Sequence, residues 1–158
     1  MIMKPTWKQY ALWIGLTESV GGLSALLSRQ GMKLYEAAVP HPPLSPPMWL
    51  FPVVWATLYA LLGISAARVS ALPASVGKCC GQKLFFTQLI FNFFWSIIFF
   101  NLQAYWSAFW WLVILWTLVL GMILCYRKVD KTAAWLQLPY LLWLTFAGYL
   151  NFWVAANF

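Results

Sequence analysis

The sequence predicts an all-α membrane protein, a single domain spanning residues 1–158 and built as a bundle of five transmembrane helices. Three observations support this fold class. The chain is 63% hydrophobic and only 8% charged, whereas soluble domains carry about 25% charged residues. A soluble fold of this length has no core large enough to bury so much apolar surface. Finally, the chain contains five apolar runs, at residues 7–27, 48–67, 84–100, 106–126 and 133–154. Each run is close to the roughly 20 residues that an α-helix needs to cross a bilayer.

Each run is expected to be helical because a backbone in lipid must satisfy its hydrogen bonds internally. The first run follows two lysines, as a signal peptide would, but its length and Glu18 favour a first span. The second begins in PPMWLFPVVW, where prolines are tolerated because the first helical turn has no hydrogen bond to lose. The connection before it, 29–47, contains VPHPPLSPP and is expected to be extended and stiff.

The remaining connections are shorter or richer in small residues. The third and fourth runs are joined so tightly that they must be antiparallel neighbours, and a tight turn leads into the fifth. The connection 68–83 is expected to be flexible and contains Cys79 and Cys80, while Cys125 ends the fourth run. Because adjacent cysteines rarely bridge each other and a reducing compartment keeps thiols free, we expect no disulfide.

The net charge of +7 reflects membrane topology and does not indicate nucleic-acid binding. If five spans alternate in direction, one side holds eight Lys and Arg residues and the other only Arg29 and Lys33. This asymmetry follows the positive-inside rule. It predicts an integral membrane protein in a lipid bilayer, with a cytoplasmic N-terminus. Together with the absence of a presequence it favours a bacterial plasma membrane, with a mitochondrial or an outer membrane as the alternatives.

Aromatic and polar side chains recur on one face of three spans, at helical spacing. These stripes are Phe51, Trp55, Tyr59 and Gly63 in the second span, Gln88, Asn92, Trp95 and Ser96 in the third, and Pro139, Trp143, Ala147, Leu150 and Asn151 in the fifth. One interpretation is close helix packing, with amides bonded between helices. The other is a shared cavity, where rings stack on a flat apolar ligand and a few polar groups orient it.

Three motifs, PPMWLFPVVWATLYALLG, QLIFNFFWSIIFF and LPYLLWLTFAGYLN, occur in this order in a five-span chain. The pattern resembles the TspO/translocator protein family, also called tryptophan-rich sensory protein or peripheral-type benzodiazepine receptor. The resemblance implies a five-helix bundle, commonly a homodimer, with a pocket lidded by the loop 29–47. It implies ligands such as porphyrins, haem and other tetrapyrroles, and synthetic isoquinoline carboxamides and benzodiazepines, with no required cofactor.

The stripes and the resemblance together predict eleven ligand-binding residues. They are Tyr35, Phe51, Trp55, Tyr59, Gln88, Asn92, Trp95, Trp143, Ala147, Leu150 and Asn151. The family's cholesterol-recognition segment is not matched, because the chain ends LNFWVAANF, with Phe152 in place of a tyrosine and no basic residue after it. This departure counts against cholesterol binding.

Three functions are compatible with these features. The first is a membrane receptor or carrier for porphyrins and similar flat hydrophobic molecules, with a transport or sensing role. The second is an enzyme, although the only histidine is His41 and no span carries a carboxylate pair or a set of metal ligands. Light-dependent porphyrin breakdown, which the resemblance allows, needs only tryptophans. The third is a small-solute transporter that uses Glu18, the one acid within a span.

Overall fold

The computed structural model describes residues 4–158, and this part of the chain is all-helical. Its elements are α1 (Trp7–Ala38), α2 (Leu50–Ser70), α3 (Val76–Ser96), the π-helix η1 (Ile97–Asn101), α4 (Tyr105–Val129), α5 (Lys131–Trp135) and α6 (Leu138–Asn157). Within these residues, five helical segments are long and apolar enough to cross a membrane: α1, α2, α3 with η1, α4, and α5 with α6. The predicted fold class is confirmed.

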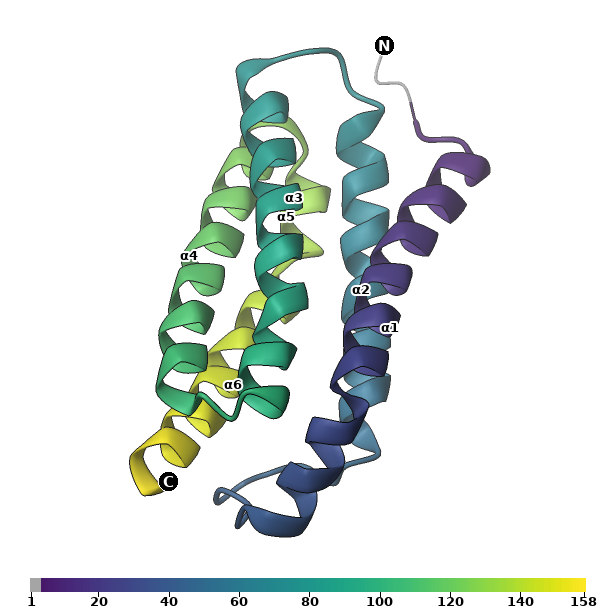
Figure 1. Cartoon of the computed structure of the whole chain (residues 1–158). Coiled ribbons are helices and arrows are strands. Elements are labelled where there is room, and N and C mark those ends of the chain that lie inside the picture. The colour runs from purple at the N-terminus through teal and green to yellow at the C-terminus, as the bar shows by residue number, and fades with distance from the viewer. Residues whose placement is uncertain (1–3) are drawn as a thin grey trace.

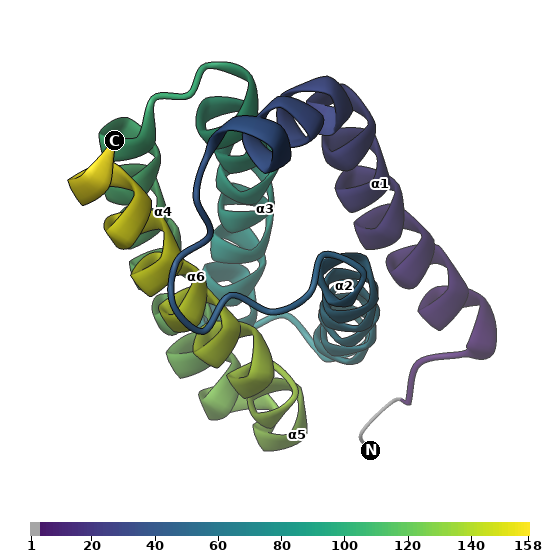
Figure 2. The same ribbon diagram turned by 90° about the horizontal axis from the view of Figure 1, so that it is seen from below.

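Successive spans run antiparallel, so the two ends of the bundle differ. The start of α1 lies at one end, while the C-terminus and the loop 39–49 lie at the other (Figure 1). We call these the N-terminal end and the loop end. The helix α3 packs along α4, α6 also packs against α4, and α1 packs against α2. Viewed along the bundle, the loop 39–49 crosses the end face before it enters α2 (Figure 2).

The helix α1 continues well past residue 27, where the first span was expected to end. Its last turns pack on η1, where Asn101 Nδ2 donates a hydrogen bond to a carbonyl of α1 at 3.0 Å. The helix stops only before Pro40, which disfavours helical dihedrals at the preceding residue. Val39 is accordingly extended, with φ −106° and ψ 122°. The connection predicted at 29–47 is therefore shorter, and its non-helical part is the loop 39–49.

The helix α3 also begins earlier than predicted, because Ser75 caps it by accepting a backbone N–H at 3.1 Å. In its first turns Cys80 forms a disulfide with Cys125 of α4, so the expectation of no disulfide is wrong. Cys79 is free and exposed. The pairing depends on α3 packing against α4, which brings the two Cα atoms to 6.2 Å. That tertiary contact leaves no signal in cysteine spacing.

At the N-terminal end, Asp130 organises the junction between α4 and α5. Its carboxylate accepts the backbone N–H groups of Thr132 at 2.9 Å and Ala133 at 3.2 Å, which caps α5. It also accepts two hydrogen bonds from the Arg68 guanidinium, at 2.8 and 3.2 Å. The end of α2 is thereby tied to the last span.

Candidate ligand-binding site

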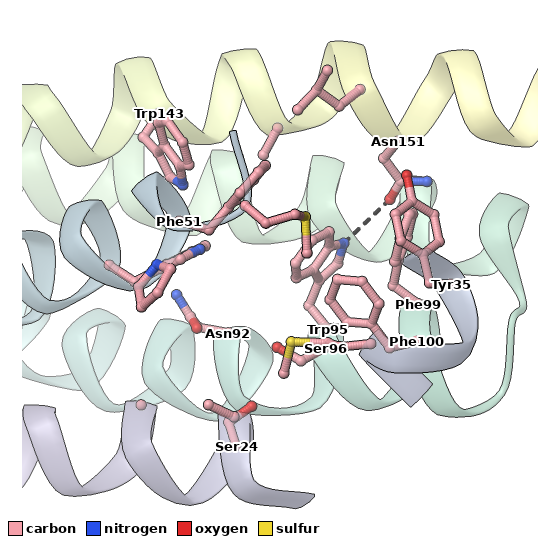
Figure 3. A pocket seen from close by; sticks show the side chains of 18 of the residues that line it. Ser24, Tyr35, Phe51, Asn92, Trp95, Ser96, Phe99, Phe100, Trp143 and Asn151 are labelled. Atoms are coloured by element: carbon pink, nitrogen blue, oxygen red, sulfur yellow. Dashed lines mark hydrogen bonds between the residues drawn. The ribbon is translucent and has the colours of Figure 1, made fainter. Parts of the chain in front are cut away.

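A cavity of about 350 Å³ lies between the spans at the loop end. Its walls come from α1, α2, α3, η1 and α6, and the loop 39–49 contributes its roof. The volume is within the range of about 300–1,000 Å³ for small-molecule sites. Figure 3 shows side chains from these elements, including Phe51, Asn92 and Trp143, facing the same space.

Ten of the eleven side chains nominated from the sequence line this cavity. They are Tyr35, Phe51, Trp55, Tyr59, Asn92, Trp95, Trp143, Ala147, Leu150 and Asn151. Gln88 does not line it: the residue is fully buried behind the wall and accepts a hydrogen bond from the Tyr140 hydroxyl at 2.9 Å. The three stripes thus converge on one space, and ligand binding by these residues stays a prediction.

The helices α2 and α6 form an aromatic wall. Phe51, Trp55 and Tyr59 follow one another at intervals of four residues, so they lie on one face of α2. Across from them, the Trp143 ring centroid lies 5.8 Å from that of Phe51 and 6.4 Å from that of Trp55, in edge-to-face arrangements. These contacts fix the rings and leave an apolar surface for a ligand.

The opposite wall is built by the junction of α3 and η1. The Trp95 ring stacks on Phe99 with centroids 5.3 Å apart, and Tyr35 of α1 packs against the same Phe99 ring, also at 5.3 Å. The indole N–H of Trp95 donates to Asn151 Oδ1 at 3.2 Å (Figure 3). Asn151 Nδ2 in turn donates to the Tyr105 carbonyl at 2.9 Å. Both the ring and the amide are therefore held by the scaffold.

The roof is the loop 39–49, from which His41, Ser45 and Met48 line the cavity. Its prolines restrict the backbone. A tertiary contact also fixes it, because the Tyr149 hydroxyl of α6 donates to the Pro43 carbonyl at 3.1 Å.

The TspO/MBR family model matches residues 13–156 of this chain. The chain belongs to the TspO/MBR family. Its relatives include the tryptophan-rich protein TspO of Chlorobaculum tepidum, 35% identical over 90% of both chains. The translocator protein of Bos taurus is 31% identical over 95% of this chain and 90% of its own. Protein CrtK of Rhodobacter capsulatus is 41% identical over 68% of each.

The pocket of this TspO/MBR protein also contains residues that sequence reasoning did not single out. They are Gly21, Ser24, Ala25 and Met32 of α1, His41, Ser45 and Met48 of the loop, Pro52 of α2, and Phe99 and Phe100 of η1. Ser96, the last residue of α3 and a member of the predicted stripe of the third span, lines the pocket as well. The turn of π-helix rotates η1 relative to α3, and such turns are frequent at functional sites. The small residues of α1 repeat at helical spacing, and this pattern could have indicated that α1 contributes to the pocket wall.

The spacing of small residues in the stretch GLTESVGG predicts a packed face of α1 at Gly15, Ser19 and Gly22, and the structure shows this prediction to be wrong. A Cβ added at Gly15 or Gly22 meets no atom within 4 Å. The packed face is the neighbouring one: Thr17 Oγ1 donates to the Tyr59 carbonyl at 2.7 Å, and Gly21 lies directly against the Tyr59 ring. Both faces carry small residues at the same spacing, so only the partner helix distinguishes them.

The polar atoms at the cavity of this TspO/MBR chain are mostly engaged by the protein. The Tyr59 hydroxyl donates to Asn92 Oδ1 at 2.6 Å, and Asn92 Nδ2 donates to the Tyr140 hydroxyl at 2.5 Å. Trp143 differs, because its indole nitrogen is buried without a hydrogen-bond partner among residues 4–158. An unpaired buried donor costs about 1–3 kcal/mol, so a ligand with a hydrogen-bond acceptor would be favoured beside it.

Ionisable groups are scarce around this cavity. Among residues 4–158 no group of three or more His, Cys, Asp or Glu side chains is placed to hold a metal ion. Glu18 lies on α1 and is not among the side chains that line the cavity. The cavity is therefore mainly apolar and poor in ionisable side chains, within an integral membrane protein of the TspO/MBR family.

Proposed function

We propose that this protein is a membrane receptor or carrier that binds porphyrins and similar flat hydrophobic molecules in the aromatic pocket. The observation that carries the proposal is the convergence of Trp55, Trp95 and Trp143, from three different spans, on one roofed cavity. Flat rings bind well to such walls because aromatic faces and edges offer large contact areas at little cost in side-chain entropy. The family of the chain supports the same reading.

The orientation of the protein follows from its charges. Four helix ends lie at the N-terminal end: the start of α1, the end of α2, the start of α3 and the end of α4. These segments carry most of the lysines and arginines of the chain. By the positive-inside rule this end faces the cytoplasm. The pocket then lies toward the other side of the membrane, in the plasma membrane of a bacterium. We further propose a homodimer, which rests on the family resemblance.

The test is binding of protoporphyrin IX to the purified protein in detergent micelles, measured in the dark by porphyrin fluorescence. Loss of one stacking ring in Trp55→Ala or Trp143→Ala is expected to cost about 1–3 kcal/mol, which is about 5- to 150-fold in Kd. Trp143→Phe keeps an aromatic ring and removes the unpaired indole N–H. Its loss of porphyrin affinity should therefore be smaller than that of Trp143→Ala, and it measures the hydrogen bond between the indole N–H and the ligand.

The matched control is Trp110→Ala, because Trp110 lies on α4, is 61% exposed and does not line the cavity. Its Kd should equal that of the parent. If Trp55→Ala and Trp143→Ala also bind as tightly as the parent, the ligand does not occupy this cavity and the proposal is wrong.

A further inference from the structure

A second hollow lies on the outer surface of the bundle, between α2 and α6. It is an open groove of about 450 Å³, and Trp143 lines both this groove and the pocket. We call it the outer groove. Its lining includes Val53, Thr57 and Leu61 of α2 and Leu142, Trp143 and Phe146 of α6. The lining is apolar except for the Thr57 hydroxyl, which donates to the Val53 carbonyl of its own helix at 2.9 Å. Because Val53 is 54% and Leu142 70% exposed, the groove opens toward lipid in a membrane.

The helices α2 and α6 are tied together near the N-terminal end only. Ser65 Oγ donates to the Ala133 carbonyl of α5 at 2.8 Å, and Gln137 Nε2, just before α6, donates to the Leu61 carbonyl at 3.2 Å. From Leu61 to the loop end, no hydrogen bond joins α2 to α6 within residues 4–158. In this described part their backbones hardly approach each other, whereas α1 packs along α2 and α6 along α4. Toward the loop end, only side chains fill the space between α2 and α6.

Aromatic rings separate the outer groove from the pocket. Trp143 extends from α6 toward α2 (Figure 3), where its ring meets Phe51 and Trp55 edge to face. Its indole N–H has no hydrogen-bond partner among residues 4–158, so the ring can turn without breaking a hydrogen bond. Trp111 and Trp116 of α4 differ, because hydrogen bonds of 2.7 and 2.9 Å hold their indoles. The partition between the two hollows is therefore held by ring contacts alone.

Other sides of the pocket are closed more firmly. Gly21 of α1 lies directly against the Tyr59 ring of α2, and Gly31 lies against the backbone of Phe100 in η1. The space between α3 and α6 is backed by α4, which packs against both helices. The loop 39–49 covers the end face and is bonded to α6 at 3.1 Å. Opening the pocket between α2 and α6 disturbs fewer of these contacts than opening it elsewhere.

We propose that the outer groove is a lateral entrance, in which a flat hydrophobic ligand docks from the bilayer and then passes Trp143 into the pocket. This inference rests on the proposed function, because it gives the route by which the same ligand reaches the same site. Apolar molecules leave water for lipid, so a ligand of this class arrives at the side of the bundle. There the groove offers it an apolar surface that ends at the ring shared with the pocket.

The experiment fills the outer groove and follows protoporphyrin IX in phosphatidylcholine vesicles, in the dark. Val53→Trp and Thr57→Trp each place a large ring in the groove, at positions that do not line the pocket. Titration gives Kd, displacement by excess iron protoporphyrin IX gives the release rate, and their quotient gives the association rate. Both rates should fall by about tenfold or more with Kd unchanged, because a blocked entrance raises the barrier in both directions.

The matched control is Ile114→Trp on α4, which adds the same ring at a position that is 46% exposed and lines neither hollow. Its rates should equal those of the parent. Trp143→Phe tests the partition itself. If the indole limits entry, the smaller ring raises the association rate. If Trp143 only contacts the bound ligand, the release rate alone rises, and the assignment of Trp143 to the entrance is wrong.

The contrary results separate this inference from the proposed function. If the parent binds protoporphyrin but either filled variant exchanges it as fast as the parent, the groove holds lipid acyl chains only and the entrance lies elsewhere. A weaker Kd without a parallel fall in both rates, or equal slowing in Ile114→Trp, also overturns the inference. In each of these cases the proposed function stands. If the parent binds no porphyrin, the proposed function fails, and this inference fails with it.

Discussion

Gly63 of α2 packs directly on the backbone of α1, and replacing it with alanine should force the two helices apart. An added Cβ would lie 2.5 Å from Ile14 Cα, 2.7 Å from Ile14 N and 2.9 Å from the Trp13 carbonyl carbon. These are backbone atoms, so no change of rotamer relieves the overlap. Non-bonded carbon atoms rest about 3.5–4.0 Å apart, which requires α1 and α2 to separate by about 1 Å.

The expected cost follows from two opposing effects. Overpacking of this kind destabilises by about 1–3 kcal/mol, while alanine is better than glycine in a helix by about 1 kcal/mol. Because the neighbours of Gly63 are rigid backbone, the upper part of the range applies, and we expect a net loss of about 1–2 kcal/mol. Ligand binding should weaken as well, since α1 forms one wall of the pocket.

The assay is thermal unfolding in one detergent, with the parent, Gly63→Ala and two controls measured side by side. The controls are Gly15→Ala and Gly22→Ala on α1, where an added Cβ meets nothing within 4 Å. They should melt at or above the temperature of the parent. The reasoning is refuted if Gly63→Ala melts with the parent, or if Gly22→Ala loses as much stability.

Three further substitutions test other contacts within the bundle. Tyr140→Phe removes the acceptor of Asn92 Nδ2 in the core and should lower stability by about 1–3 kcal/mol in the same melting assay; an unchanged melting temperature would show that the amide finds another partner. Asp130→Ala removes the cap of α5 and the partner of Arg68, and should cost about 0.5–2 kcal/mol from the cap alone. A melting curve identical to the parent would refute that role. For the disulfide, intact mass after alkylation should show one modified thiol in the unreduced parent and a second one in Cys80→Ser. Three modified thiols in the unreduced parent would disprove the bridge.

The helices and most of the pocket were predictable from local properties. A run of apolar residues in lipid must be helical, because no water is present to satisfy an exposed backbone. Helical spacing then places Phe51, Trp55 and Tyr59 on one face of α2 whatever surrounds it. The same holds for Asn92 and Trp95 on α3. All five of these side chains line the cavity.

Spacing alone could not tell which member of a stripe reaches the cavity. Gln88 lies one turn from Asn92 on α3, yet it is fully buried behind the wall, where it bonds Tyr140. The length of α1 was also misjudged, because the polar residues after 27 look like a loop and are held as helix by contacts with η1. Neither fact is encoded in a local pattern.

The sequence by itself determined that this chain forms five apolar helices with aromatic stripes on three of them, because hydrogen bonding and periodicity act within each segment. Only the tertiary structure decided which face of α1 packs, that Cys80 meets Cys125, and that η1 closes the wall with Phe99. The physical reason is that lipid chains are as apolar as leucine. A membrane helix therefore shows little contrast between the face that meets lipid and the face that meets protein, and the partner helices make that choice.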